Sequence, residues 1–152
     1  MTAAVYALRL ATTADLPALL PRTRALNDHE GIAVTDAALA TALGRLLADP
    51  GLGAVWLVTA TEGRPVGYAI VTFGFDLEFG GRDAWLTELW IDDADRGAGA
   101  AATALALLDE ELRARDVAAV HLQVRPGNPA MRVYERAGFH VVPRAIMSRR
   151  LR

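Results

Sequence analysis

Hydrophobic and polar positions follow two different periods along the chain, and together they predict a domain that mixes strands and helices. Short apolar runs rich in valine, leucine and aromatic residues are typical of strands, and they occur at 5–11, 54–60, 66–75, 83–91 and 117–124. Apolar residues that recur every three or four positions are typical of helices, and they occupy 16–26, 35–48, 98–115 and a short stretch ending at 136. Residues 139–151 are expected to add one or two final strands.

The segments between these runs predict how the elements connect. Residues 27–31 interrupt the first helix, and a turn at 62–65 joins two strands into a hairpin. In the strand at 83–91, alternation places Leu86, Glu88 and Trp90 on one face. The element order β-α-α-β-β-β-α-β-α-β predicts an α+β fold, a mixed and mostly antiparallel central sheet flanked by helices, in a single domain over residues 1–152.

Composition excludes several classes of chemistry. The chain has no cysteine and no lysine, so it has neither a thiol nucleophile nor a lysine that could form a Schiff base. Its net charge of −2 lacks the basic excess of a nucleic-acid-binding protein. The longest run of small apolar residues, 97–108, is about half of the roughly 20 residues that a membrane span requires. We therefore expect a cytoplasmic protein that binds neither nucleic acid nor membrane.

A glycine-containing turn between the strand at 83–91 and the next helix gives the clearest chemical signal. It comprises Arg96, Gly97, Ala98, Gly99, Ala100, Ala101 and Ala102. Small residues allow a ligand to approach the backbone, and the N–H groups of a helix N-terminus favour a phosphate or pyrophosphate. Two other interpretations fit the turn. One is a tightly packed helix start, and the other is the dinucleotide fingerprint Gly-x-Gly-x-x-Ala at 97–102.

Two segments resemble the signatures of one enzyme family. Residues 96–101 resemble the Q/R-x-x-G-x-G/A signature that holds the CoA pyrophosphate in the GNAT superfamily of acetyl-CoA-dependent N-acetyltransferases. Residues 128–139 resemble the second signature of that family, N-x-x-A-x-x-L-Y-x-x-x-G-F, with Asn128 one residue closer to the alanine. The predicted element order is similar to that of the family, so the resemblance covers essentially the whole chain.

The resemblance implies transfer of an acetyl group from acetyl-CoA to a primary amine of a small molecule or peptide by direct attack. It implies that the backbone of Leu89, Trp90 and Ile91 holds the pantetheine arm, and that Asn128 and Tyr134 join the turn at 96–102 in the CoA site. The strand at 86–91 resembles that of polyamine and thialysine acetyltransferases, in which an acidic residue takes the place of Glu88. Glu88 is then the base, acting through a water, and the phenol of Tyr134 is the acid that protonates the thiolate.

Several further residues complete the predicted site. The acceptor candidates are Asp28, His29, Glu30, Asp76 and Glu78. Carboxylates around one cleft favour a cationic amine. His121 and His140 lack the spacing of a metal-binding pair, so we predict no metal. The apolar stretch 141–147 is expected to pair across a homodimer. A catalytically silent domain that senses CoA thioesters is the alternative function.

Overall fold

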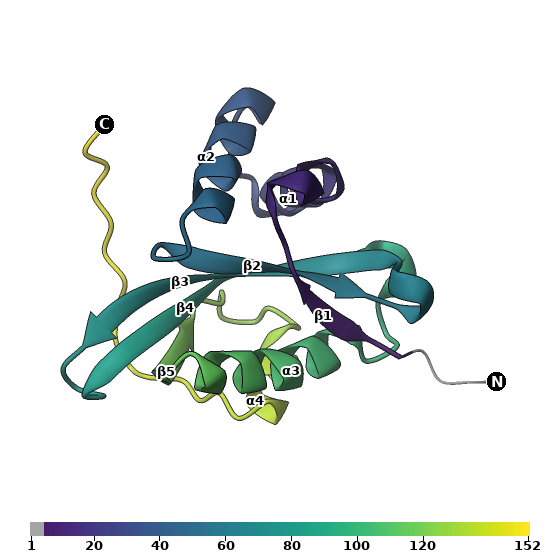
Figure 1. Cartoon of the computed structure of the whole chain (residues 1–152). Coiled ribbons are helices and arrows are strands. Elements are labelled where there is room, and N and C mark those ends of the chain that lie inside the picture. Colours follow the sequence, from purple (N-terminus) through teal and green to yellow (C-terminus); the bar gives the residue numbers. More distant parts are fainter. Residues whose placement is uncertain (1–4) are drawn as a thin grey trace.

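The computed structural model describes residues 5–152 and contains one five-stranded sheet with helices on both faces (Figure 1). The strands are β1 (Ala7–Leu10), β2 (Gly53–Thr59), β3 (Pro65–Asp76), β4 (Gly81–Ile91) and β5 (Val117–Leu122), in that order across the sheet. β1 to β4 form an antiparallel meander, and β5 pairs with β4 in parallel after the crossover helix α3 (Ala100–Ala114). The predicted α+β class with a mostly antiparallel sheet is confirmed.

Helices cover both faces of this sheet. α1 (Leu16–Glu30) and α2 (Asp36–Ala48) lie on one face, and α3 and the short α4 (Met131–Arg136) lie on the other (Figure 1). Thr35 caps α2, because its hydroxyl oxygen accepts a hydrogen bond from the Ala38 N–H at 3.2 Å. Within residues 5–152, none of the helices combines the length and the apolar character that a membrane crossing requires.

Each face of the sheet has its own hydrophobic core, because side chains alternate between the two faces of every strand. The core on the α3 side contains Trp56, Leu86, Leu105, Leu108 and Leu112. The core beneath α1 and α2 contains Leu19, Leu43, Leu57, Tyr68 and Ile70. The two cores hold α1 and α3 against opposite faces of β3 and β4, and the candidate site lies between these elements.

The first helix extends through residues 27–30, which the polar sequence pattern assigned to a loop. Asn27 is only 5% exposed, and its Nδ2 donates to the Thr23 carbonyl one turn earlier at 2.8 Å. This hydrogen bond satisfies the buried amide inside the helix. α1 ends at Gly31, which adopts the left-handed conformation with φ 69°. Asp28, His29 and Glu30 therefore lie on the last helical turn.

One extra residue in β4 changes which side chains share a face. Leu86 is opposite Val71 on β3, and Glu88 is opposite the preceding residue of β3, so Thr87 forms a β-bulge. Leu86 packs into the α3 core, whereas Glu88 contacts Tyr68 on the α1 side. The prediction that Leu86 shares a face with Glu88 and Trp90 is wrong, because the bulge interrupts the two-residue alternation.

The C-terminal segment, residues 139–152, contains no strand, although the sequence pattern predicted one or two. It runs away from the sheet (Figure 1), and Val141, Ile146 and Met147 are each more than half exposed. A strand requires a neighbour that pairs with its N–H and C=O groups. Along its path the segment instead contacts the β3–β4 turn, where Arg144 forms an ion pair with Glu78 at 3.1 Å.

We predict that replacing Leu108 by alanine lowers the free energy of unfolding by about 2–5 kcal/mol, because the change leaves a cavity in the α3 core. Leu108 is 2% exposed. The control is Val5→Ala, just before β1, where valine is 69% exposed and the loss should stay below about 0.5 kcal/mol. Urea unfolding measures both values, and equal losses in the two variants would contradict the assigned core.

Candidate active site

β4 stops pairing with β5 near its middle, which leaves one backbone edge of β4 without a strand partner in the described chain. The last paired residues are Leu86 on β4 and Leu122 on β5, so within residues 5–152 the end of β4, residues 87–91, has no partner on β5. An extended ligand can pair with such a strand edge as a neighbouring strand would. The predicted pantetheine-binding residues, Leu89, Trp90 and Ile91, lie on this stretch.

Residues 88–91 of β4 pair with β3, but residues 87–91 have no partner on β5, and we call residues 87–91 the unpaired end of β4. The glycine turn follows it and leads into the N-terminus of α3. Gly97 and Gly99 have φ values of 80° and 86°, and Gly99 is the N-cap residue of α3. A Cβ at either position would meet nothing within 4 Å, so an alanine side chain would not clash. Glycine is favoured here because of the positive φ angle, which other residues rarely adopt. In the described part of the chain, no side chain caps this end of α3. Its first N–H groups can therefore bind an anion.

Arg96 is held beside this turn by three contacts. Its Nε donates to the Ile91 carbonyl at 2.9 Å, and its Nη1 lies 2.7 Å from the Asp93 carboxylate. The guanidinium also stacks on Trp90, 4.5 Å from the ring centre. The side chain is still 46% exposed, so an anion in the turn can reach it.

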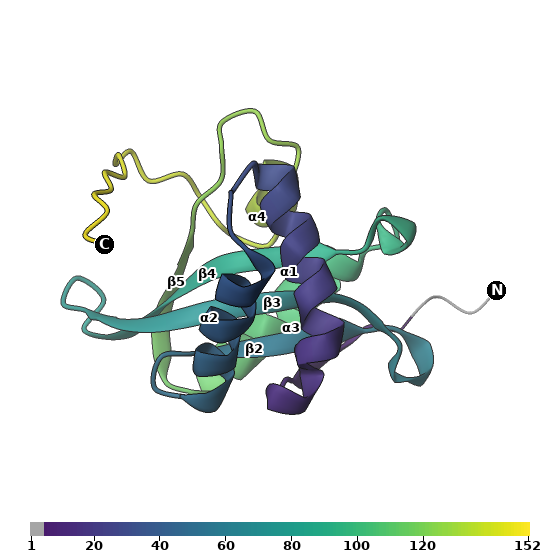
Figure 2. The ribbon, with the colours of Figure 1, turned by 90° about the horizontal axis from the view of Figure 1, so that it is seen from above.

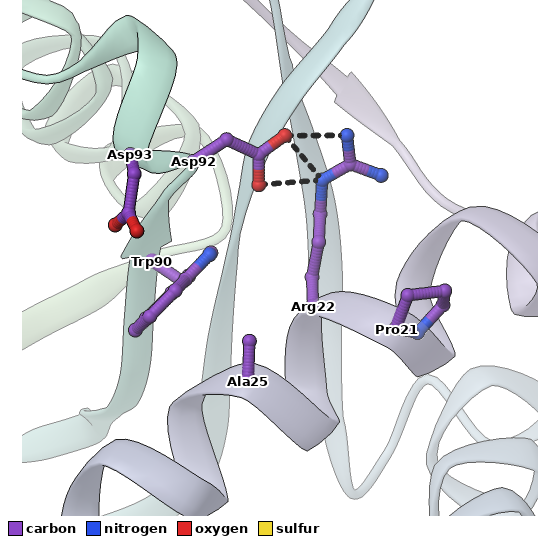
Figure 3. Close-up of a pocket in the computed structure, with 6 residues that line it drawn as sticks. All are labelled: Pro21, Arg22, Ala25, Trp90, Asp92 and Asp93. Atoms are coloured by element: carbon purple, nitrogen blue, oxygen red, sulfur yellow. Dashed lines mark hydrogen bonds and ion pairs between the residues drawn. The ribbon is translucent and has the colours of Figure 1, made fainter.

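An open cavity of about 320 Å³ lies between α1 and the end of β4 (Figure 3). It is lined by Pro21, Arg22, Ala25, Trp90, Asp92 and Asp93. Arg22 Nη2 lies 2.6 Å from Asp92 Oδ2, and Arg22 Nε donates to Oδ1 at 3.0 Å. Arg22 also donates to the Pro65 carbonyl at 3.0 Å, so this one side chain connects α1 to both β3 and β4.

A second cavity of about 350 Å³ lies between α3 and α4, lined by Ala102, Leu105, Ala106, Asp109, Val133, Arg136 and Ala137.

Glu88 is paired with a residue that sequence reasoning missed. The Tyr68 hydroxyl on β3 donates to Glu88 Oε2 at 2.6 Å. Burial raises the pKa of Glu88, and the hydrogen bond from Tyr68 opposes this shift. Burial, followed by the charge of Glu88, raises the pKa of Tyr68 so far that the phenol stays protonated. A carboxyl group with a raised pKa is suited to accept a proton near neutral pH.

Tyr134 lies on α4 and packs edge-on against Phe139, with 6.0 Å between the ring centres. Burial raises the pKa of Tyr134, and the negative charge of Glu30 acts in the same direction. The phenol is therefore protonated at neutral pH and can act as a proton donor. The influence of Glu30 also places the end of α1 near α4.

The last turn of α1 carries three of the predicted acceptor residues toward this region. The His29 ring lies edge-on to Trp90 with 6.2 Å between ring centres, and Glu30 Oε2 lies 3.5 Å from Arg125 Nη2. Asp28 Oδ1 lies 3.6 Å from Arg24 Nη1. Acidic side chains at a helix C-terminus oppose the helix dipole. Their position is therefore unfavourable for the helix itself, and the ion pairs with Arg24 and Arg125 offset part of this cost.

The other two predicted acceptor residues have different surroundings. Asp76 faces Asp83 and His121, and Glu78 pairs with Arg144. The β3–β4 hairpin that carries them extends beyond the helices at one end of the sheet (Figure 2). The structure therefore brings His29 next to Trp90 and Glu30 next to Arg125, whereas Asp28 contacts Arg24 within α1. Asp76 and Glu78 have other neighbours.

Asn128 has a structural partner in the loop before α4. Its Oδ1 accepts a hydrogen bond from the Ala130 N–H at 2.9 Å, which shapes the turn into the helix. Besides the partner of Glu88, two long-range pairs could not be predicted from the sequence. Arg22 and Asp92 are 70 positions apart, and Glu30 and Arg125 are 95 positions apart, so no local pattern could have revealed either pair.

The chain belongs to the acetyltransferase (GNAT) family, whose sequence pattern matches residues 22–139. This match spans the glycine turn, the unpaired end of β4 and Tyr134, and it identifies an acetyltransferase domain. No curated protein sequence matches the chain. The polyamine and thialysine branch suggested by the strand at 86–91 is not established by this match.

Solved structures with the same fold include proteins related to acetyl transfer. An integron cassette protein from the mobile metagenome of Cole Harbour Salt Marsh has a TM-score of 0.84 and 28% identity, covering 95% of this chain and 90% of that chain. A predicted acetyltransferase with acetyl-CoA from Clostridium acetobutylicum has a TM-score of 0.74 and 24% identity, covering 95% and 96%. An aminoglycoside N-acetyltransferase in complex with CoA has a TM-score of 0.81 and 17% identity, covering 99% and 97%.

We predict that Glu88→Gln gains stability relative to the wild type as the pH rises. The pKa of Glu88 is higher in the folded chain than its ordinary value of 4.5, so the folded state binds this proton more tightly. That stabilisation is complete below the unfolded pKa and is lost as the pH rises through the folded pKa. Urea unfolding from about pH 4 to about pH 8 measures the effect. Glu110→Gln, on the exposed side of α3, is the matched control; a flat difference for Glu88→Gln would contradict the burial of its charge.

Proposed function

We propose that this domain transfers the acetyl group of acetyl-CoA to a primary amine of a small molecule or peptide. The proposal rests on three features that lie next to one another along β4 and the start of α3. A buried carboxyl, a strand edge without a partner and an anion-binding helix N-terminus follow one another between Glu88 and Ala102. The CoA-bound and acetyl-CoA-bound structures with the same fold support this use of the site.

In this proposal the CoA pyrophosphate binds the backbone of residues 97–102, with Arg96 as a cationic contact. The pantetheine arm pairs with the backbone of Leu89, Trp90 and Ile91 along the unpaired end of β4. A backbone N–H of the same stretch polarises the thioester carbonyl. Asn128 contributes through the turn that it holds before α4, which positions Tyr134.

The proposed reaction is a direct displacement. The ammonium group of the acceptor first loses a proton to Glu88 through a water, because only the neutral amine is nucleophilic. The amine nitrogen then attacks the thioester carbonyl carbon, a C–N bond forms and the C–S bond breaks. The electron pair of the broken bond leaves on sulfur, and the Tyr134 O–H protonates the thiolate. The extra proton on the attacking nitrogen then passes through water to the Tyr134 phenolate, which leaves a neutral amide and restores the phenol. Without cysteine or lysine, the chain offers neither residue for a covalent acetyl-enzyme.

We propose a cationic acceptor, of the polyamine or thialysine kind, bound near the last turn of α1. Asp28 and Glu30 provide negative side chains there, and the carbonyl end of the helix adds partial negative charge. Both carboxylates have an arginine neighbour, Arg125 for Glu30 and Arg24 for Asp28. The Asp28 side chain is 67% exposed and that of Glu30 is 34% exposed, so Asp28 is the more available carboxylate. His29 and Trp90 supply the adjoining aromatic surface.

The alternative is a domain that binds the CoA thioester as a sensor without turnover. The same helix N-terminus and strand edge would serve that function, whereas the raised pKa of Glu88 would have no use in it. The dinucleotide interpretation of Gly97 and Gly99 lacks support, because membership of the acetyltransferase family accounts for the same turn.

We predict that CoA thiol is released from acetyl-CoA in the presence of a polyamine, thialysine, an aminoglycoside or a short peptide. Glu88→Gln and Tyr134→Phe should each lower turnover by about 10²–10⁴-fold, because each removes a proton-transfer group. Acetyl-CoA binding, measured by calorimetry, should persist in both variants. Glu110→Gln and Tyr6→Phe are the matched controls. Binding without turnover across the panel would favour the sensor, and loss of binding in Glu88→Gln would overturn its role as base.

We also propose that the domain forms a homodimer in which the C-terminal segment of one copy pairs with the other. The segment exposes Val141, Val142, Ile146, Met147 and Leu151, and the neighbouring β3–β4 hairpin exposes Phe75 at the end of β3 and Leu77 and Phe79 in its turn. Large apolar residues gathered in two adjacent segments are typical of an interface.

Light scattering on the purified protein should give twice the mass of one chain. Deletion of residues 141–152 should give a monomer, because it removes half of the proposed interface. The paired substitution Ile146→Ser and Met147→Ser is a milder test that keeps the chain length. A wild-type monomer at micromolar concentration would overturn the proposal.

A further inference from the structure

Three adjacent strands bring one histidine and two aspartates together at the hairpin end of the sheet. Asp76 on β3, Asp83 on β4 and His121 on β5 each place a ligating atom within 4.8 Å of the others. The sheet register explains the arrangement. Asp83 is flanked by Gly74 on β3 and Ala119 on β5, and these small residues leave space for its carboxylate. A Cβ on Gly74 would lie only 2.7 Å from Asp83 Oδ1.

In the described chain, two members of this cluster lack the hydrogen bonds that polar groups shielded from solvent normally make: the ring nitrogen Nε2 of the half-buried His121 and the carboxylate of Asp83. His121 Nε2 is inaccessible to solvent and has no hydrogen-bond partner among the described residues. The Asp83 side chain is 9% exposed, and no hydrogen bond to its carboxylate is present within residues 5–152. Nε2 and Asp83 Oδ2 are 3.3 Å apart, but they are not aligned as a hydrogen bond. Because a polar atom shielded from water is costly when unpaired, His121 Nε2 points to a missing ligand, and the Asp83 carboxylate beside it is available to share that ligand.

Histidine spacing along the sequence predicted no metal, but the fold adds two aspartates to His121. We propose that Asp76, Asp83 and His121 bind a divalent transition-metal ion, with zinc as the preferred occupant. An imidazole nitrogen with two carboxylate oxygens is a ligand set that zinc accepts, and a water completes four-fold coordination. Zinc–ligand bonds of about 2.1 Å place tetrahedral ligands roughly 3.4 Å apart. The 3.3 Å separation of Nε2 and Oδ2 already fits that value. Calcium and magnesium are disfavoured, because they prefer oxygen ligands alone.

The surroundings of the cluster hold its ligands in place. The His121 ring lies against Trp85 and Phe79, with ring centres 5.0 and 5.3 Å away. Asp76 Oδ1 accepts a hydrogen bond from the Glu78 N–H at 2.8 Å, which orients this carboxylate and leaves its second oxygen for the metal. The metal would thus link β3, β4 and β5 directly and stabilise the projecting hairpin. This site is independent of the proposed acetyl transfer.

The test is a titration of tag-free protein, stripped with a chelator, with zinc chloride. The wild type should bind one equivalent, and its melting temperature should rise by roughly 5–10 °C at 100 times the dissociation constant. Cobalt(II) in place of zinc should give the visible absorption of a four-coordinate ion. His121→Gln and Asp83→Asn should abolish both effects, while His140→Gln, at a histidine outside the cluster, should keep them. Calcium chloride should produce no shift.

Asp76→Asn covers the case in which a change at the buried Asp83 prevents folding. Asp76 is half-buried, so its variant should fold and bind zinc at least ten-fold more weakly. Equal zinc binding by the wild type and His121→Gln would overturn the proposal. So would a wild type that binds no zinc at micromolar concentration, since His121 and Asp83 would then form only an ion pair. Acetyl transfer is not a readout in any of these experiments, so failure here is separate from failure of the proposed function.

Discussion

The β-bulge at Thr87 is the constraint on which the candidate active site depends. Without this extra residue, Glu88 would share a face with Leu86 and enter the α3 core, where a carboxyl group would have no partner. With it, Glu88 turns to the α1 side and meets the hydroxyl of Tyr68. The bulge also precedes the stretch of β4 that no longer pairs with β5, which is the strand edge proposed to hold the pantetheine arm. A single inserted residue thus places the proposed base and the proposed ligand-binding edge on one strand.

The second requirement is that α1 stays in a fixed position over this strand. Arg22 anchors one part of α1 through Asp92 and the Pro65 carbonyl, and Glu30 at its end contacts Arg125 in the loop after β5. Both ion pairs are partly exposed, so each adds little to overall stability. Their importance is geometric. They connect α1 to the unpaired end of β4 and to the loop before α4, and these are the elements that carry Glu88 and Tyr134.

Sequence patterns predicted most of the fold because the helices and strands here have regular periods and conventional ends. Thr35 capping α2 and the glycine turn before α3 were both visible in the sequence. The pattern failed where tertiary contacts override local preference. Asn27 is polar, yet a hydrogen bond within α1 keeps it buried and helical. The bulge at Thr87 shifts the register without a glycine or proline to mark it, and this hid the pairing of Glu88 with Tyr68. Residues 139–152 have the composition of a strand but lack a neighbour to pair with in this chain.

The acidic end of α1 has a consequence for how the proposed reaction finishes. Its carboxylates and the negative end of the helix dipole would attract the proposed acceptor, which carries a positive charge. Acetylation converts that ammonium group into a neutral amide, so the attraction that brought the acceptor to the site is weaker for the product. A second, unreacted acceptor then competes well for the same position. The end of α1 would in this way favour release of the product. The loss of positive charge on acetylation would itself favour replacement of the product by an unreacted acceptor.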